Sequence, residues 1–343
     1  MGVAEQVSYL TFLRRLRKLA EMALASYELE GADLKFINYS GNGLYQVRIP
    51  KERFIAPGKY ALRLHQPDYM KPEHICSEME WLSALHNAGI QAPMPKRNLT
   101  GDWLTVTEGD FSVPQQRNCT LIGWTEGQIL GEKVRPKHFR SLGRLIGRLH
   151  EHSRKWKPPK GFARPHWNWD GLYGEGFSYG APAADAREAI PKVHQTAFNR
   201  VLDILREVSE TLGRGKDVYG LIHADLGLAE NVAFLGGEAK PFDFDDCGFG
   251  YWVFDIAVPL SQHFIDTGDR SKETYDSLKS GYEETSSLEG IGIEYLNHFI
   301  AARLAQFMFF YQASGMAHPQ YMEASKQGVN EHAKYLKKIL KEM

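Results

Sequence analysis

Hydrophobic and polar positions follow two different periods along the chain, and the change of period divides it into two parts. Up to about residue 122, short segments alternate between apolar and polar residues, as half-buried strands do, around one stretch of helical periodicity. The predicted elements are a leading helix over 7–29, a strand pair over 36–49, a helix over 74–88, and strands over 60–65, 103–107 and 119–124. This pattern predicts an α+β lobe.

From Pro136 onward the pattern is mainly helical. Amphipathic helices are predicted over 142–156, 190–212 and 293–311, and the Gly- and aromatic-rich segment 161–180 is predicted to be an ordered loop. A short connector, IGWTEG, separates the two patterns. The expected organisation is therefore an N-terminal lobe over 1–121, a hinge over 122–127 and a helical C-terminal lobe over 128–343.

Composition is ordinary for a globular protein and narrows the class of partner. The 343 residues are 43% hydrophobic and carry a formal net charge of −1, which gives no reason to expect nucleic acid or an anionic membrane as partner. Three scattered cysteines predict no disulfide framework. The N-terminus lacks the pattern of a signal peptide, and the longest apolar stretch, 299–311, is broken by Arg303 and Gln306. A soluble cytoplasmic protein is expected, of unknown oligomeric state.

One predicted hairpin gathers acidic and amide side chains at its open end. Two glycines form a turn signal between an apolar run over 232–235 and a returning strand over 238–242. A two-residue loop at this point places Asn231 opposite Phe242 and Glu230 opposite Asp243. The hairpin therefore carries Asp243 back beside the loop that contains Asp225.

This arrangement suits phosphoryl transfer. One carboxylate can orient an acceptor hydroxyl and accept its proton, while an amide oxygen and a second carboxylate hold Mg²⁺ against nucleotide phosphates. Asp225 fits the first role and Asp243 the second. His223 follows two apolar residues, so it is expected to brace the loop rather than react.

The same stretch resembles a known family. HAD…N…FDFDDCGFGYWVFDIA is similar to the HGDxxxxN…IDFxxxGxGxxxxDLA pattern of the aminoglycoside phosphotransferase and choline kinase family, which has a two-lobed protein-kinase-like fold. FARPHWNWDGLYG, after a helix ending LGRLIGRLHEHSRKW, resembles a branch with stress-response-kinase-like and homoserine-kinase-like members. The resemblance covers roughly residues 30–315. It implies ATP and Mg²⁺ as cofactors and a small-molecule hydroxyl as acceptor.

The resemblance also assigns roles in the N-terminal lobe. Backbone N–H groups of the turn that contains Ser40, Asn42 and Gly43 would approach phosphates, although a plain hairpin turn would look the same. Arg63 occupies the strand position where kinases keep a phosphate-binding Lys. Its partner on the following helix is expected to be Glu78, with Glu80 second and an exposed helix carboxylate as the alternative for both.

Other positions follow from the same match. The connector with Trp124 and Glu126 resembles the family's hinge, whose backbone would bind the adenine edge; Trp124 lines the nucleotide site or simply packs. Asp255 matches an Asp that ties down the catalytic loop, and Asp245 is a second choice as metal ligand.

The loop after Asp225 departs from the family pattern. The metal-binding Asn of the family comes five residues after the catalytic Asp, but here Glu230 is fifth and Asn231 is sixth. Either the loop bulges so that Asn231 reaches the metal, or Glu230 replaces it, since a carboxylate is an equally good hard ligand. Asn231 is preferred and Glu230 is second.

The acceptor pocket is the least determined part of the site. Its candidates by position are Trp167, Trp169, Tyr251, Trp252 and Glu283, with Glu284 beside the last. The aromatic residues would suit a cage for a cationic acceptor, but core packing is their commoner use. The main hypothesis is thus a small-molecule kinase acting on an aminoglycoside, choline, homoserine or similar. The alternatives are a protein Ser/Thr kinase of stress-response type and a catalytically weak nucleotide-binding module, which Arg63 and the lengthened loop favour.

Overall fold

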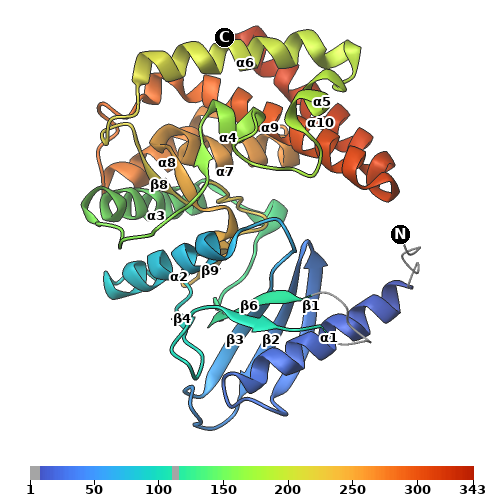
Figure 1. The fold of residues 1–343 in the computed structure, drawn as a ribbon. Coiled ribbons are helices and arrows are strands. Elements are labelled where there is room, and N and C mark those ends of the chain that lie inside the picture. The colour runs from blue at the N-terminus through green and yellow to red at the C-terminus, as the bar shows by residue number, and fades with distance from the viewer. Residues whose placement is uncertain (1–7, 110–115) are drawn as a thin grey trace. The chain divides into compact units, whose positions relative to one another are not determined.

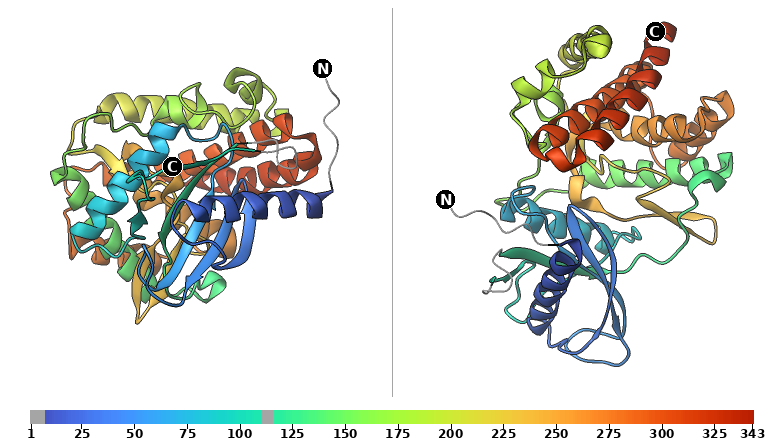
Figure 2. Two further views of the ribbon diagram at one scale, coloured as in Figure 1. Left: turned by 60° about the horizontal axis from the view of Figure 1, so that its bottom comes forward. Right: turned by 90° about the vertical axis from the view of Figure 1, so that its right-hand side faces the viewer.

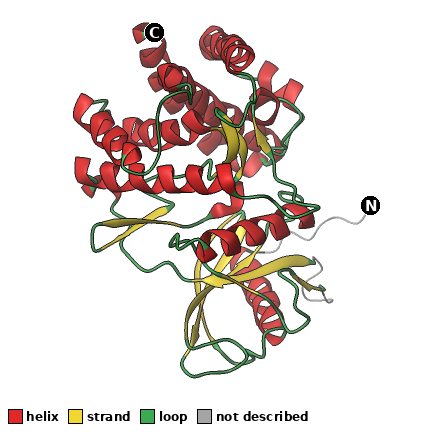
Figure 3. Cartoon of the chain, turned by 90° about the vertical axis from the view of Figure 1, so that its left-hand side faces the viewer, coloured by secondary structure: helices red, strands yellow, loops and turns green. Residues whose placement is uncertain are grey.

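The computed structural model describes residues 8–109 and 116–343 of the chain. These divide into two compact units (Figure 1). Unit 1 comprises Met1–Asn87 and Ala92–Thr125, and unit 2 comprises Ala88–Gln91 and Glu126–Met343. Each unit has its own arrangement of elements, and Figure 3 shows that the long strands belong to the first and most helices to the second.

Unit 1 is built on an antiparallel sheet. Its strands are β1 (Asp33–Ser40), β2 (Asn42–Ile49), β3 (Gly58–Leu64), β4 (Pro95–Lys96), β5 (Thr105–Thr107) and β6 (Arg117–Gly123). They follow the order β1-β2-β3-β6-β4, with β5 also paired to β6. All the predicted strands are present, because the alternation that marks a strand is a local signal. Their ends differ by a few residues from the predicted ranges 36–49, 60–65, 103–107 and 119–124.

Two helices complete unit 1: α1 (Tyr9–Ala25) and α2 (Pro72–Asn87). The Ser8 hydroxyl accepts a hydrogen bond from the Thr11 N–H and caps α1. The buried face of α1, which includes Leu16 and Leu19, packs on the sheet, as Figure 2 shows. The helix is shorter than the predicted 7–29 because Glu28 takes a left-handed φ of 54°. Val7 lies outside the described residues.

Unit 2 is mainly helical, as predicted. Its helices are α3 (Pro136–Lys155), α4 (Trp169–Tyr173), α5 (Ala183–Glu188), α6 (Lys192–Leu212), α7 (Trp252–Thr267), α8 (Lys272–Glu283), α9 (Leu296–Ala317) and α10 (Met322–Glu342). Short 3₁₀ helices span Gly131–Lys133, Phe244–Asp246, Ile293–Tyr295 and Pro319–Tyr321. The predicted loop over 161–180 is wrong in detail, because it contains α4 and a short strand.

Two small sheets accompany these helices. β8 (Tyr219–Ile222) and β11 (Gly248–Tyr251) run antiparallel, and β7 (His166–Trp167) pairs in parallel with β11. β9 (Val232–Leu235) and β10 (Glu238–Pro241) form a hairpin. Asp225 follows β8 of the first sheet, whereas Asn231 and Asp243 flank the hairpin of the second.

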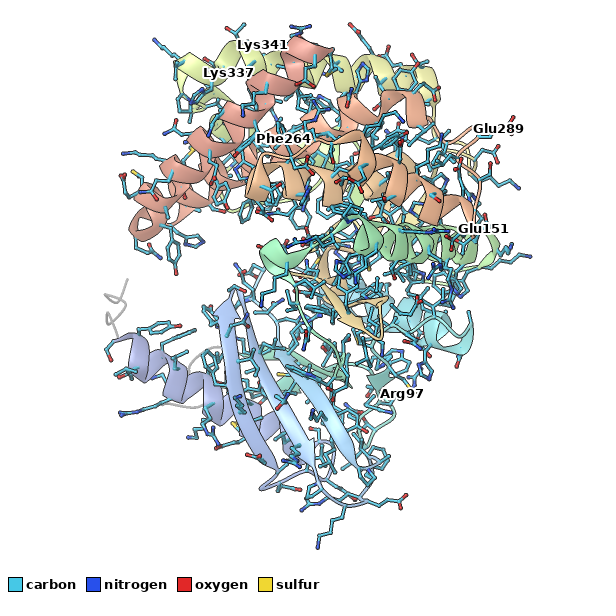
Figure 4. The ribbon with its side chains drawn as sticks, turned by 180° about the vertical axis from the view of Figure 1, so that it is seen from behind. Arg97, Glu151, Phe264, Glu289, Lys337 and Lys341 are labelled. Atoms are coloured by element: carbon cyan, nitrogen blue, oxygen red, sulfur yellow. The ribbon has the colours of Figure 1, made fainter. Side chains whose placement is uncertain are left out.

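The C-terminal helices enclose the core of unit 2. α9 is buried on most of its faces and lies against α7 and α10, and Figure 2 shows α9 and α10 side by side. Figure 4 labels Phe264 on α7, which packs edge-on against Tyr335 of α10. It also labels Lys337 of α10, whose Nζ donates to the carbonyl of Val193 in α6 (2.9 Å). None of the described helices is long and apolar enough to cross a membrane.

Candidate active site

The loop after β8 is held by one buried carboxylate. Asp255 of α7 accepts hydrogen bonds from the backbone N–H groups of His223 (3.2 Å) and Ala224 (2.7 Å). Ala224 has a left-handed φ of 67°, which is strained for a residue with a side chain. Burial alone would raise the pKa of Asp255, but His150 and the Ala224 N–H outweigh it and keep this pKa below its usual value. Asp255 thus makes the contact predicted for it.

His223 links this loop to the hairpin. Its Nε2 lies 3.1 Å from the Phe242 carbonyl oxygen, and its ring packs at 4.3 Å from the ring of Phe244. The side chain is fully buried. These contacts suit the bracing role expected for it.

The hairpin has the predicted register. Val232 pairs with Pro241 and Leu235 with Glu238, and the two turn glycines have φ values of 61° and 85°, as a tight hairpin turn requires. The Phe242 N–H donates to the Asn231 carbonyl (3.0 Å), so these two residues face each other as expected.

Asn231 and Asp225 are in direct contact. Asn231 Nδ2 donates to Asp225 Oδ2 (2.7 Å) and to the Asp225 carbonyl (2.8 Å). The extra residue of the loop is absorbed in a turn, where the N–H groups of Glu230 and Asn231 both point to the Gly227 carbonyl. The Glu230 side chain is exposed, yet partial desolvation and the charges of Asp225 and Asp266 raise its pKa.

The segment after the hairpin presents Asp243 to solvent. Asp243 takes a left-handed φ of 59°, and the buried Phe244 begins a 3₁₀ turn. Asp245 is buried, so it is a poorer candidate for an open metal position than Asp243.

Two side chains fix the backbone of this segment. The Arg164 guanidinium, which is buried, donates to the carbonyls of Asp245 and Cys247 (2.5 Å for Nε to the latter). The Trp167 indole N–H donates to the Asp246 carbonyl (2.6 Å). The expectation that Trp167 contacts the acceptor is corrected: it is buried and supports the segment with Asp243.

The residues fit a divalent metal that also binds phosphates. The two hydrogen bonds from the Asn231 amide to Asp225 use Nδ2, so they do not occupy the amide oxygen Oδ1. An amide oxygen and a carboxylate are hard ligands of the kind that divalent cations such as Mg²⁺ and Ca²⁺ prefer. Across residues 8–109 and 116–343 no cluster of three His, Cys, Asp or Glu could hold a metal alone. A metal on Asn231 and Asp243 would therefore need further oxygen ligands, which phosphates supply.

In unit 1, Arg63 and Glu78 form the expected pair. Arg63 Nη1 lies 2.8 Å and 3.0 Å from the two carboxylate oxygens of Glu78, and both side chains are buried. Glu80 instead accepts the Trp103 indole N–H (2.5 Å) near the surface. Glu78 is thus the partner of Arg63, and a role for the pair in nucleotide binding stays a prediction.

The turn between β1 and β2 is tight and has a packing explanation. Ser40 pairs with Asn42 across Gly41, and Asn42 Oδ1 accepts the Gln66 N–H (2.8 Å). A Cβ on Gly43 would lie 2.7 Å from Cδ2 of Leu16 on α1, so a larger residue there would force the Leu16 side chain to shift. The phosphate-covering role of this turn also stays a prediction.

The connector residues lie in different units. Trp124 lies in unit 1, is half-buried and donates its backbone N–H to the Lys59 carbonyl (3.1 Å). Glu126 begins unit 2 and is exposed. Their part in adenine binding stays a prediction.

Most residues proposed to contact the acceptor are used in packing instead. Tyr251 and Trp252 are 1% exposed and donate to the carbonyls of Ser209 and Lys216, so neither can line an open pocket. The Trp169 indole lies under the Arg206 guanidinium (4.1 Å to the ring centre) and bonds to α6. Glu283, the last residue of α8, is exposed. The following residue, Glu284, accepts hydrogen bonds from Arg140 and Arg144 of α3.

The sequence analysis did not predict that Arg303 belongs to the candidate site. This residue of α9 is buried and forms an ion pair with Asp225. Its signal was present in the sequence, because Arg303 and Gln306 interrupt an otherwise apolar helical stretch. A charge at such a position is rarely buried without a partner, but one sequence does not say which carboxylate it meets.

The class of kinase-like phosphotransferases combines an antiparallel sheet, as in unit 1, with a helical part, as in unit 2. It also has an Asp and an Asn in one loop and a second Asp after a hairpin, as at Asp225, Asn231 and Asp243. The chain matches the model of the phosphotransferase enzyme family over residues 42–288, and it belongs to that family. It is accordingly an enzyme, a phosphotransferase of the small-molecule kinase class with an alcohol group as acceptor. The predicted fold class and family are confirmed.

Individual relatives agree with this assignment. Amicoumacin kinase of Bacillus subtilis (strain 168) is 24% identical over 298 residues, which cover 83% of this chain and 81% of the relative. The structure of a microcompartment-associated aminopropanol kinase matches with a TM-score of 0.75 and 27% identity, covering 93% of this chain and 95% of that one. A complex of an amicoumacin kinase with AMP-PNP and Ca²⁺ has the same fold, at TM-score 0.75, 19% identity and 96% coverage of both chains.

Proposed function

We propose that the protein transfers the γ-phosphoryl group of ATP, with Mg²⁺, to the hydroxyl of a small amino alcohol. The observation that carries the proposal is the hydrogen bond from Asn231 Nδ2 to Asp225 Oδ2, which joins an amide and a carboxylate in the loop where the family keeps its base and metal ligand. Residues 1–121 are proposed as the nucleotide-binding lobe, 122–127 as the hinge and 128–343 as the catalytic lobe.

Each side chain has a defined task in this proposal. Asp225 accepts a hydrogen bond from the acceptor hydroxyl and takes its proton as the hydroxyl oxygen bonds to the γ-phosphorus and the bond to the ADP oxygen breaks. Asn231 Oδ1 and Asp243 hold the metal, which neutralises phosphate charge when bound. Arg63, oriented by Glu78, contacts the nucleotide phosphates.

An amine on the acceptor is favoured by charge. Burial raises the pKa of Glu230 most, the charges of Asp225 and Asp266 add to the rise, and the charge of Arg303 opposes it. An ammonium group beside them would relieve this repulsion. The relatives named for aminopropanol and amicoumacin support the same acceptor class.

The first experiment identifies the acceptor. ADP release from ATP and Mg²⁺ is measured with 1-amino-2-propanol, ethanolamine, choline, homoserine and an aminoglycoside, and radiolabel transfer is measured with a protein extract. ADP formation with an amino alcohol is the expected result. Label entering protein alone would point to a protein kinase, and thermal stabilisation by Mg-ATP without any ADP would point to a regulatory module.

The second experiment tests Asp225. Asp225→Asn keeps the size of the side chain but removes the proton acceptor, so turnover should fall about 10²–10⁴-fold. Binding of Mg-AMP-PNP, measured by calorimetry, should change little, because the variant retains Asn231 and Asp243. Normal turnover in this variant would remove Asp225 from the mechanism.

A further inference from the structure

A buried guanidinium holds the proposed base from the side opposite Asn231. Arg303 of α9 is 6% exposed and pairs through Nη2 with Asp225 Oδ1, 78 residues away in sequence. Asn231 Nδ2 contacts the other carboxylate oxygen, Oδ2. The two oxygens of Asp225 are therefore held by donors from two separate elements.

Arg303 is itself held in place. Its Nη1 donates to Gln306 Oε1 (2.8 Å), and Gln306 Nε2 lies 3.0 Å from the Tyr179 hydroxyl. The Phe307 ring lies under the guanidinium, 4.3 Å from its central carbon. Because rotation of Arg303 would break these contacts together, the guanidinium is a rigid support for the carboxylate.

The charge of Arg303 has one described counter-ion. Within residues 8–109 and 116–343, Asp225 is the carboxylate with which Arg303 forms an ion pair. A buried cation is tolerated when it is paired and hydrogen-bonded, so the structure keeps Arg303 where Asp225 needs it. The Asp225 side chain is still 25% exposed, so the paired carboxylate remains accessible to an acceptor.

We propose that Arg303 is a positioning residue that fixes the Asp225 carboxylate for the acceptor hydroxyl. With Oδ1 held by Arg303 and Oδ2 by Asn231, the carboxylate cannot turn about its last bond, and a hydroxyl that bonds to it meets one orientation. Positioning of this kind contributes to rate because reacting groups must be aligned closely. The inference rests on the proposed role of Asp225.

The expected effect is on turnover and not on ATP binding. Arg303→Met removes both the charge and the donors, and kcat should fall about 10–100-fold while the KM for ATP stays within about twofold. Arg303→Lys keeps the charge but loses the paired donors, so it should restore part of the loss. Gln306→Leu leaves Arg303 in place but loosens it, and it should give a smaller loss of kcat.

A double-mutant cycle distinguishes positioning from general packing. ADP release is measured with 1-amino-2-propanol and, in parallel, without an acceptor, for Asp225→Asn, Arg303→Met and the double variant. If Arg303 acts through Asp225, adding Arg303→Met to Asp225→Asn should cost less than twofold more. Arg270→Ala, which removes a surface ion pair with Glu342, is the control for losing an arginine of unit 2.

Each outcome decides the inference. An equal loss from Arg303→Met in both backgrounds, or full activity in Arg303→Met, would overturn it while leaving the role of Asp225 intact. Normal turnover in Asp225→Asn, or no ADP release by the unaltered protein, would overturn the proposed function and this inference with it. Should Arg303→Met not fold, Gln306→Leu replaces it in the same cycle.

Discussion

At the scale of single residues, the pair Arg63–Glu78 combines stability with a proposed role in binding. Both groups are buried, and the guanidinium is shared between both carboxylate oxygens. A buried pair is costly to break because one charge is left uncompensated, although replacing both partners by apolar groups can be nearly neutral. Comparing a single with a double substitution therefore separates the contribution of the pair to stability from its proposed role in nucleotide binding.

We expect Glu78→Ala to lower the free energy of unfolding by about 3–5 kcal/mol, since it leaves the Arg63 charge buried. The double variant Arg63→Met/Glu78→Leu should recover most of that stability and still bind Mg-AMP-PNP weakly. Urea unfolding and calorimetry measure the two quantities. Glu21→Ala, which breaks the exposed Arg17–Glu21 pair on α1, is the control and should cost about 0–1 kcal/mol. Unchanged nucleotide affinity in the stable double variant would argue against a phosphate contact by Arg63.

The roles of single residues were only partly accessible from the sequence. Asp225, Asn231 and Asp243 stand in a pattern that chemistry demands, so they could be proposed from spacing. Arg303 could not, because its partner lies 78 residues away and only the packing of α9 joins them. Tyr251 and Trp252 show the reverse error, since aromatic residues near a motif are more often part of the core.

At the scale of elements, two side chains of the segment 162–167 hold the backbone of residues 245–247, which follow the proposed metal ligand Asp243. Arg164 and Trp167 bind the carbonyls of Asp245, Asp246 and Cys247 in succession. Groups that hold metal ligands in place commonly change metal affinity about 10–100-fold when they are removed. If Asp243 binds the metal as proposed, Trp167 of β7 should affect metal affinity without contacting substrate.

Trp167→Phe keeps the ring but removes the indole donor, and we expect the Mg²⁺ concentration for half-maximal activity to rise about 10-fold. Titration of ADP release with Mg²⁺ at saturating ATP measures it. Trp169→Phe also loses an indole hydrogen bond, but to Leu202 on α6, and serves as the matched control. Equal shifts in both variants would indicate a general loss of packing.

Element prediction succeeded where the signal is local. The β9–β10 hairpin was predicted with its register because two glycines dictate the turn. α7 was not predicted from periodicity, since most of its faces are buried and Pro259 lies inside it, and α10 was overlooked. β7, β8 and β11 are short, and their pairing depends on residues far apart in sequence.

At the scale of the whole molecule, buried histidines couple stability to pH. Burial lowers the pKa of His150 and of His332, so both stay neutral in the folded chain where unfolded histidine would take a proton. The unfolded state then binds more protons below about pH 6.5, the usual pKa of histidine. Stability contributed in this way is present above that pH and lost as the pH falls.

We expect the free energy of unfolding to fall as the pH is lowered from 7.5 to 5.5, by up to about 1.4 kcal/mol per pH unit for each such histidine. Urea titrations at several pH values measure the slope. His332→Asn removes one of the two groups and should make the dependence shallower. Stability that does not vary over this range would contradict the prediction.

The distance in sequence between Arg303 and Asp225 bears on how the enzyme is made. On the ribosome, the base loop, the hairpin and the metal segment all emerge before α9, which begins at Leu296, after the family match has ended at residue 288. A nascent chain at that stage carries the proposed base and metal ligands but lacks both Arg303 and α9, the buried helix that completes the core of unit 2. If Arg303 acts as proposed, a premature stop codon between the two regions yields a product that wastes little ATP, and activity begins only when translation has passed α9.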